Sequence, residues 1–168
     1  MKLIPASDAD AGLVYDIKLA AYREYAVLAY GSWDEALQRR VTGGNLPVTR
    51  LIVVADKIIG WVAASCAVEE DEIIDLHILP EHQRKGYGQE VVRRVIAEAS
   101  GAGKPVVLHV LKVNPARALY ERYGFVKIGE TATHTIMKRP NQPLQHNDRD
   151  CHGGCDAPAA PATVVADL

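Results

Sequence analysis

The residues best suited to binding chemistry form one glycine-containing segment, Gln83-Arg84-Lys85-Gly86-Tyr87-Gly88. It lies between an apolar, strand-like run at 73–79 and an amphipathic, helix-like run at 89–99. The first N–H groups of a helix have no internal partner, and the helix dipole places partial positive charge there. The two glycines allow the backbone to approach a ligand closely, and Arg84 and Lys85 add positive charge. This segment therefore predicts that the protein holds a pyrophosphate.

Gly86 and Gly88 do not belong to either of the two commoner phosphate loops. A P-loop requires G-x-x-x-x-G-K-[ST], and the chain has no glycine at that spacing before a Gly-Lys-Ser or Gly-Lys-Thr. In a dinucleotide fingerprint, G-x-G-x-x-G, the third glycine position is occupied here by Val91. The segment instead reads Q-x-x-G-x-G, which favours neither nucleotide hydrolysis nor hydride transfer. The alternative to a phosphate site is a basic turn that merely starts a helix.

A second segment follows the first after one predicted helix and one predicted strand, and it reads Asn114-Pro115-Ala116-Arg117-Ala118-Leu119-Tyr120-Glu121-Arg122-Tyr123-Gly124-Phe125. Together the two segments resemble the signatures of the GNAT superfamily of N-acetyltransferases, over residues 2–139. The resemblance implies an α/β (α+β) fold with a mixed, mostly antiparallel sheet of six to seven strands. That sheet would splay between strands four and five and be flanked by about four helices. It also implies direct transfer of an acetyl group from acetyl-CoA to a primary amine of a small molecule, protein or peptide.

The resemblance assigns the acetyl-CoA site to three parts of the chain. Backbone N–H groups of residues 84–89 would hold the pyrophosphate. Backbone groups of Ile78 and Leu79 would bind the pantetheine arm between the splayed strands and could polarise the thioester carbonyl. The residues expected to contact the cofactor are Ile78, Leu79, Gln83, Arg84, Lys85, Gly86, Tyr87, Gly88, Gln89, Asn114 and Arg117. No metal is expected.

Tyr120 is the predicted general acid. Acetyl transfer leaves a CoA thiolate that needs a proton or a hydrogen bond, and a phenol with an ordinary pKa of about 10 can supply either. Tyr120 also lies on an apolar helix stripe with Leu119 and Tyr123, so core packing is the alternative interpretation. No cysteine occupies an evident nucleophile position, which argues against a covalent enzyme intermediate.

Glu72 is the predicted general base. A free amine has a pKa of about 10.4, so it must lose a proton before it attacks. Glu72 stands at the start of the predicted fourth strand, at a spacing from Gln83 that resembles the base of the histone-acetylating branch of the superfamily. Strand alternation places Glu72 on the face opposite to Asp75 and His77, which we expect to be solvated neighbours. The alternative for Glu72 is an ordinary carboxylate at the edge of a strand.

The acceptor pocket is predicted between the first two helices, because this segment usually shapes it in the family. The candidate acceptor-binding residues are Glu24, Tyr25, Trp33 and Asp34. Aromatic and acidic groups suit a cationic amine through charge pairing and cation–π contact. The alternative is that Trp33 is a hydrophobic staple at a helix start and Asp34 a favourable charge near its first turn.

The elements that must position these residues alternate in the order β-α-α-β-β-β-α-β-α-β-β. We expect a mixed sheet covered by helices. The expected strands are 2–4, 50–55, 58–68, 72–79, 105–111, 125–128 and 134–138. Four helices are expected. The first is capped by Ser7-Asp8, the second and third span 33–41 and 89–99, and the fourth begins at Pro115 with Asn114 as its N-cap.

Composition limits the partners that the chain can have. The 168 residues carry a net charge of -2, which does not favour electrostatic binding to nucleic acid. No apolar run approaches the roughly 20 residues of a membrane span, and Pro5 interrupts the N-terminus too early for a signal peptide. Three cysteines do not make a disulfide framework. We expect a cytoplasmic protein with no membrane partner; its oligomeric state is open, with a homodimer among the options.

We expect one domain over residues 1–140 and a flexible, low-complexity tail over 141–168. The tail contains His146, Cys151, His152 and Cys155, but their spacing does not match a standard zinc module. The rival to an enzyme is a non-catalytic acyl-CoA-binding regulatory module on the same fold, because a fold does not dictate its function.

Overall fold

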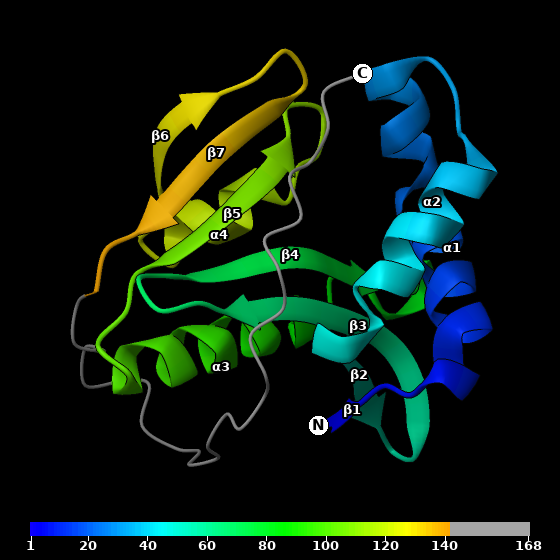
Figure 1. Ribbon diagram of the computed structural model, residues 1–168, viewed down its shortest axis with the longest axis horizontal. Helices are drawn as coiled ribbons and strands as arrows, with labels where there is room; N and C mark the ends of the chain where they lie inside the picture. The colour runs from blue at the N-terminus through cyan, green and yellow to red at the C-terminus, as the bar shows by residue number, and fades with distance from the viewer. Residues whose placement is uncertain (142–168) are drawn as a thin grey trace.

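The computed structural model describes residues 1–141, and its elements follow the predicted order (Figure 1). The strands are β1 (Lys2–Pro5), β2 (Thr49–Val54), β3 (Lys57–Cys66), β4 (Asp71–Ile78), β5 (Val106–Leu111), β6 (Val126–Glu130) and β7 (His134–Arg139). The helices are α1 (Ala11–Tyr30), α2 (Glu35–Gly44), α3 (Tyr87–Gly101) and α4 (Arg117–Arg122), with short 3-10 turns at Asp8–Asp10, Leu46–Val48 and Pro80–His82. The predicted tail, apart from Asn141, lies outside the described residues, and so do its cysteines and histidines.

The strands form a single seven-stranded sheet in the order β1-β2-β3-β4-β5-β7-β6. Every neighbouring pair is antiparallel except β4 and β5, which are parallel. These two strands pair only between Asp71–Ile73 and Val106–Leu108. Beyond Ile73 the two strands are no longer paired, and we call this unpaired region between β4 and β5 the gap. The predicted sheet with a splay between strands four and five is confirmed.

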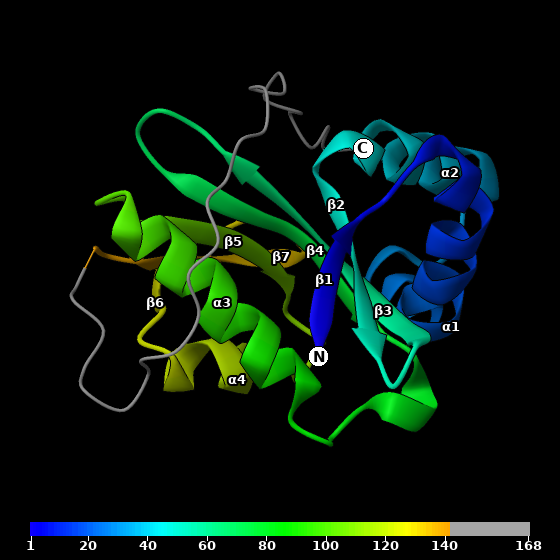
Figure 2. The ribbon, with the colours of Figure 1, turned by 90° about the horizontal axis from the view of Figure 1, so that it is seen from below.

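Helices cover the two faces of the sheet separately (Figure 2). One face packs on α3 and α4, whose buried side chains join those of the central strands in the larger hydrophobic core. The other face packs on α1 around the buried Trp61, whose indole N–H donates to the carbonyl oxygen of Val14 at 2.8 Å. No helix within residues 1–141 is both long enough and apolar enough to cross a membrane. The gap between β4 and β5 therefore connects an α3/α4 side with an α1 side.

A β-bulge in β4 corrects the predicted facing of its residues. Ala63 of β3 pairs with Asp75 and Ala64 pairs with Ile73, so Ile74 is an extra residue. Ile74 packs in the α1-side core, whereas Ile73 and Leu76 pack in the core beneath α3. The extra residue reverses the alternation, because the period of a strand is two. Glu72 and Asp75 consequently lie on the same face, and the prediction that separated them was wrong.

Candidate active site

The turn before α3 presents unpaired backbone donors. Gly86 precedes the helix with φ at 87°, in the left-handed region that favours glycine. The N–H of Glu90 is bonded to the carbonyl oxygen of Gly86 at 3.1 Å. Within residues 1–141, the N–H groups of Tyr87, Gly88 and Gln89 have no partner, as expected for the first turn of a helix.

Charge and packing place this turn beside the gap in the sheet. Arg84 and Lys85 are both exposed, so their cations are available to an anion. A methyl group added at Gly88 would lie in ordinary contact with Ile78 of β4 and Leu119 of α4. The start of α3 thus adjoins both the open end of β4 and helix α4. This arrangement fits a ligand with a pyrophosphate at α3 and an extended arm in the gap.

Backbone groups at the end of β4 form hydrogen bonds both to β3 and to the turn that follows. The amide N–H of Leu79 donates to the carbonyl oxygen of Ile59 at 2.9 Å, and its carbonyl oxygen accepts from the N–H of His82 at 2.8 Å. The Gln83 side chain donates to the carbonyl oxygen of Ile78 at 2.8 Å and so ties the turn to the strand. Because Leu79 faces β3, alternation directs the N–H groups of Ile78 and Leu76 toward the gap.

Tyr120 lies on α4, among the buried side chains of the larger core. The helix begins at Arg117, two residues later than predicted, because Asn114 to Ala116 form a tighter turn in which Asn114 Oδ1 accepts the N–H of Ala116 at 2.9 Å. Arg117 is exposed and bonds Glu121 at 2.8 Å. The Tyr120 ring is 7% exposed and packs edge-to-face on Phe125.

The phenol of Tyr120 stays protonated at neutral pH. Burial, and then the negative charge of Asp75, raise the pKa of Tyr120 to about 12. The hydroxyl makes no hydrogen bond within residues 1–141. Tyr120 therefore packs in the core, which was the alternative interpretation of its position. Its phenol is also protonated and interacts with the negative charge of Asp75.

Asp75 lies at the centre of a cluster that the sequence did not predict. Its Oδ2 accepts from the Lys18 ammonium at 3.1 Å, and its Oδ1 contacts His77 Nε2 at 3.2 Å. The rings of Tyr22 and Trp61 flank His77, with centroids at 5.2 and 4.7 Å. The expectation that Asp75 and His77 are solvated was wrong, because α1 covers them and they are largely buried.

The two acidic groups on this face have opposite pKa shifts. Burial alone would raise the pKa of Asp75, but the charges and hydrogen bonds of Lys18 and His77 hold it well below its usual range. Burial raises the pKa of Glu72, which His109 only partly offsets. Burial lowers the pKa of His77 despite its carboxylate neighbour, so the ring is neutral at pH 7 and can donate its Nε2–H. Asp75 is thus a fixed charge, whereas Glu72 is the more basic carboxylate.

Comparison with known proteins agrees with this geometry. The acetyltransferase (GNAT) domain family matches residues 48–127, which include the bulged strand, the glycine turn and α4. Residues 48–127 are therefore similar to the GNAT acetyltransferase domain. A curated relative, a ribosomal-protein-alanine N-acetyltransferase of Haemophilus influenzae, is 28% identical over 78 residues, which are 46% of this chain. The match spans about half the length of that relative, 53%.

Solved GNAT structures share the fold. An acetyltransferase from Thermus thermophilus superposes with a TM-score of 0.67 at 22% identity, covering 83% of this chain and 96% of that one. A PaiA N-acetyltransferase from Thermoplasma acidophilum, solved with coenzyme A, gives 0.67 at 13% identity over 83% and 98% of the chains. The ribosomal-protein-alanine N-acetyltransferase of Escherichia coli gives 0.66 at 19% identity over 87% and 97%.

The acceptor residues predicted from the GNAT resemblance do not all come together. Asp34 Oδ1 accepts the N–H of Leu37 at 2.9 Å, so this carboxylate caps α2, which begins two residues later than predicted. The Trp33 indole N–H donates to the Tyr15 hydroxyl at 3.2 Å. Both side chains therefore make contacts within the protein, as expected if they have a structural role at the start of α2. Tyr25 is half-buried and lies seven residues after Lys18, on the same stripe of α1.

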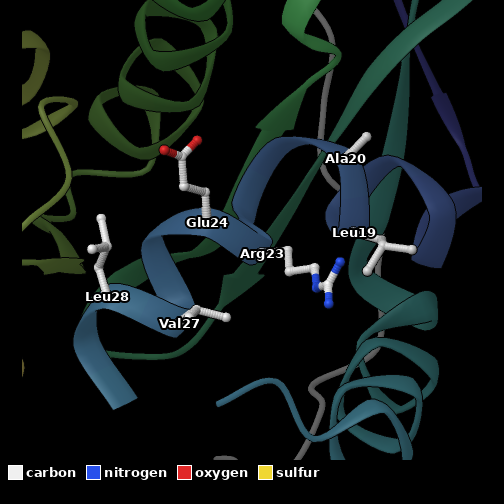
Figure 3. Close-up of a pocket in the computed structure, with 6 residues that line it drawn as sticks. All are labelled: Leu19, Ala20, Arg23, Glu24, Val27 and Leu28. Carbon is white, nitrogen blue, oxygen red and sulfur yellow. The ribbon is translucent and has the colours of Figure 1, made fainter. Parts of the chain in front are cut away.

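Glu24 lies away from the gap in the GNAT sheet. It is exposed on the outer face of α1, and two residues along a helix separate it from Tyr22 by more than half a turn. Figure 3 shows Glu24 in a shallow depression on that outer face. The depression is lined by Leu19, Ala20, Arg23, Glu24, Val27 and Leu28.

The site residues missed from sequence come mainly from α1. Lys18 is 4% exposed and stands within an apolar stripe that includes Val14 and Ile17. A lysine inside such a stripe is the signal that could have found it, because lysine is rarely buried without a partner. The bulge that turns Asp75 toward Lys18 has no comparable signal in the sequence.

Proposed function

We propose that this protein is an N-acetyltransferase that moves an acetyl group from acetyl-CoA to a primary amine. The observation that carries the proposal is the continuity of three features: unpaired N–H groups at the start of α3, free backbone donors of Leu76 and Ile78 in the gap, and Tyr120 beside it. A pyrophosphate, a pantetheine arm and a thioester follow each other in acetyl-CoA in the same order. The chain's own residues therefore fit the donor along its length.

The donor would be held mainly by backbone groups. Residues 84–89 bind the pyrophosphate, and Arg84 and Lys85 complement its charge. Gln83 keeps the turn against Ile78 through its bond to the carbonyl oxygen. Of the two residues predicted to bind the pantetheine arm, the backbone of Leu79 is already bonded, so this role falls to Ile78 and Leu76. Asn114 supports the turn that leads to α4.

The reaction follows from the protonation states in the site. The amine nitrogen attacks the thioester carbon directly, and the bond from that carbon to sulfur breaks. Tyr120 supplies a proton or hydrogen bond to the departing thiolate, because its phenol is protonated at neutral pH. Glu72 accepts a proton from the acceptor amine, directly or through water, and its raised pKa makes it a better base than an ordinary glutamate.

The acceptor is an amine of a small molecule or of a protein or peptide. The curated relative acts on an alanine of a ribosomal protein, and this makes an N-terminal alanine a reasonable member of a test panel. Small alkylamines, polyamines, aminoglycosides and lysine-containing peptides complete the panel.

Thiol release from acetyl-CoA against this panel tests the proposal. At least one amine should release CoA thiol at a rate that depends on its concentration. The rival function, a non-catalytic acyl-CoA-binding module, predicts measurable CoA affinity with no turnover for any amine. Calorimetric titration with CoA, run on the same preparation, distinguishes that result from protein that has lost its fold.

A further inference from the structure

The cluster of Lys18, Asp75 and His77 is unusual because it buries three ionisable side chains beneath α1. Lys18 and His77 are 4% and 6% exposed, whereas Asp75 keeps 18% of its side chain accessible. Burying an ion pair costs desolvation that packed apolar side chains would avoid, so such a pair is weak evidence for stability alone. Perturbed ionisable groups beside a gap are more often part of a functional site.

Asp75 keeps 18% of its side chain accessible and belongs to the part of β4 that is not paired with β5. The residue pairs with Ala63 on the β3 side, and β5 pairs with β4 only as far as Ile73. The charge of Asp75 acts on the Tyr120 phenol, although Tyr120 belongs to α4 on the opposite side of the sheet. Asp75 and Tyr120 therefore flank the gap from its two sides.

We propose that Asp75 binds the acceptor's ammonium group and positions it for reaction, with Lys18 and His77 holding the carboxylate in place. This inference rests on the proposed function and names how its acceptor is recognised. A carboxylate has about four lone-pair directions, and Lys18 and His77 use two of them. The remaining directions can accept N–H bonds from a primary ammonium that approaches from the α1 side.

The side chains around Asp75 suit a primary ammonium that is bound as a cation and then deprotonated. Neutral His77 adds no positive charge to that of Lys18, and Glu72 lies on the same face of β4. The ring of Tyr22 lies 5.2 Å from the His77 ring and 5.7 Å from the Lys18 ammonium, so it adds an aromatic surface to the cluster. Asp75 holds the ammonium, and Glu72 removes its proton.

The test compares Asp75→Asn with Asp71→Asn. Asp71 is a matched control because it is also a buried aspartate of β4 beside a lysine, Lys104 at 3.6 Å, but it lies on the face of β4 opposite to Glu72 and Asp75. The acceptor is the amine of the panel with the fastest thiol release. Asp75→Asn should raise the KM of that acceptor about ten- to a hundredfold, with the KM of acetyl-CoA unchanged. Asp71→Asn should leave both KM values near wild type.

A second variant keeps the test decisive if Asp75→Asn fails to fold. Lys18→Met combined with Asp75→Asn removes both charges of the pair and avoids an unpaired buried lysine. This double variant should show the same selective rise in acceptor KM. Equal effects of the Asp75 and Asp71 substitutions on acceptor KM would overturn the proposal, and so would a loss of acetyl-CoA binding that matches the loss of acceptor binding.

Calorimetric binding separates this inference from the proposed function. The CoA-loaded protein is titrated with the alanyl tetrapeptide and with its Nα-acetylated form, which lacks the ammonium group. Preferential binding of the free amine that Asp75→Asn abolishes, without turnover of any amine, would support the inference and end the proposal of an enzyme. Equal binding of the two peptides, or no binding of either, would end the inference.

Discussion

Tyr120 and Asp75 approach the gap between β4 and β5 from opposite sides of the sheet. The phenol is protonated because burial and the nearby carboxylate both disfavour its anion. The carboxylate is ionised because Lys18 and His77 stabilise it. A proton donor on one side and a fixed negative charge on the other suit a reaction in which a thiolate leaves and a cationic amine arrives.

Replacing Tyr120 with phenylalanine should lower kcat about a hundredfold, because the departing thiolate loses its proton donor. The KM of acetyl-CoA should change little, because the ring and its packing on Phe125 remain. Initial rates at varied acetyl-CoA concentration measure both constants. Tyr123→Phe, on the same helix end, is the control and should behave as wild type. A kcat for Tyr120→Phe equal to that of wild type would remove this residue from the chemistry.

His77 should make the fold less stable as the pH falls below about 6.5, the ordinary pKa of histidine. Burial depresses the pKa of folded His77, and the groups facing it are Asp75, Lys18, Tyr22 and Trp61. Between its folded pKa and 6.5, the unfolded chain binds a proton that the folded protein does not. Stability is therefore lost as the pH falls through this window, by at most about 1.4 kcal/mol per pH unit.

Urea unfolding between pH 7.5 and 5 measures this effect of His77. His77→Gln should reduce the slope of the unfolding free energy against pH. His82→Gln, in the short turn after β4, serves as the control and should keep the wild-type slope. An identical slope in wild type and His77→Gln would contradict the assignment.

At the scale of elements, the turn before α3 and the bulge in β4 set the geometry of the site. The left-handed Gly86 turns the chain so that three unpaired N–H groups of α3 point outward together. The bulge at Ile74 turns Asp75 and His77 toward α1 while Leu76 and Ile78 pack beneath α3. One irregular residue thus gives β4 a donor-binding edge and an acceptor-facing surface.

Gly86→Ala should weaken CoA binding about tenfold, because a left-handed conformation costs a residue with a Cβ roughly 1–2 kcal/mol. The cause is conformational, since an added Cβ at Gly86 would meet no atom within 4 Å. Gly12→Ala is a matched control, because its Cβ also meets nothing but it lies inside α1, where alanine is favoured. Calorimetric titration with CoA measures both variants. Unchanged affinity in Gly86→Ala would contradict the role given to this turn.

At the scale of the whole molecule, the split sheet separates the two substrates. In the proposed function, the donor would lie along the α3/α4 side and reach into the gap, and the acceptor would come from the α1 side. The two can therefore be bound at once, which suits direct transfer in a ternary complex and needs no covalent enzyme intermediate. All the residues given a role in this arrangement lie between Lys18 and Tyr120.

A chain that ends after Asn141 should fold and bind CoA as the full chain does. Residues 1–141 contain all seven strands of the sheet and every residue assigned to the site. Thermal unfolding and CoA titration of the shortened chain provide the measurement. A drop in Tm of several degrees, or a weaker Kd for CoA, would show that residues 142–168 contribute to the domain.

The amino-acid sequence by itself determined the element order and singled out the glycine turn and Tyr120 as candidates, because these depend on local signals. Glycine spacing, helix caps and alternating apolar residues act over a few positions and can be read along the chain. The sequence could not show that Lys18 meets Asp75, 57 residues away, or that Ile74 forms a bulge. A bulge arises from pairing between strands, and it reverses the facing of every residue beyond it. Tertiary structure alone therefore decided the acceptor side of the site.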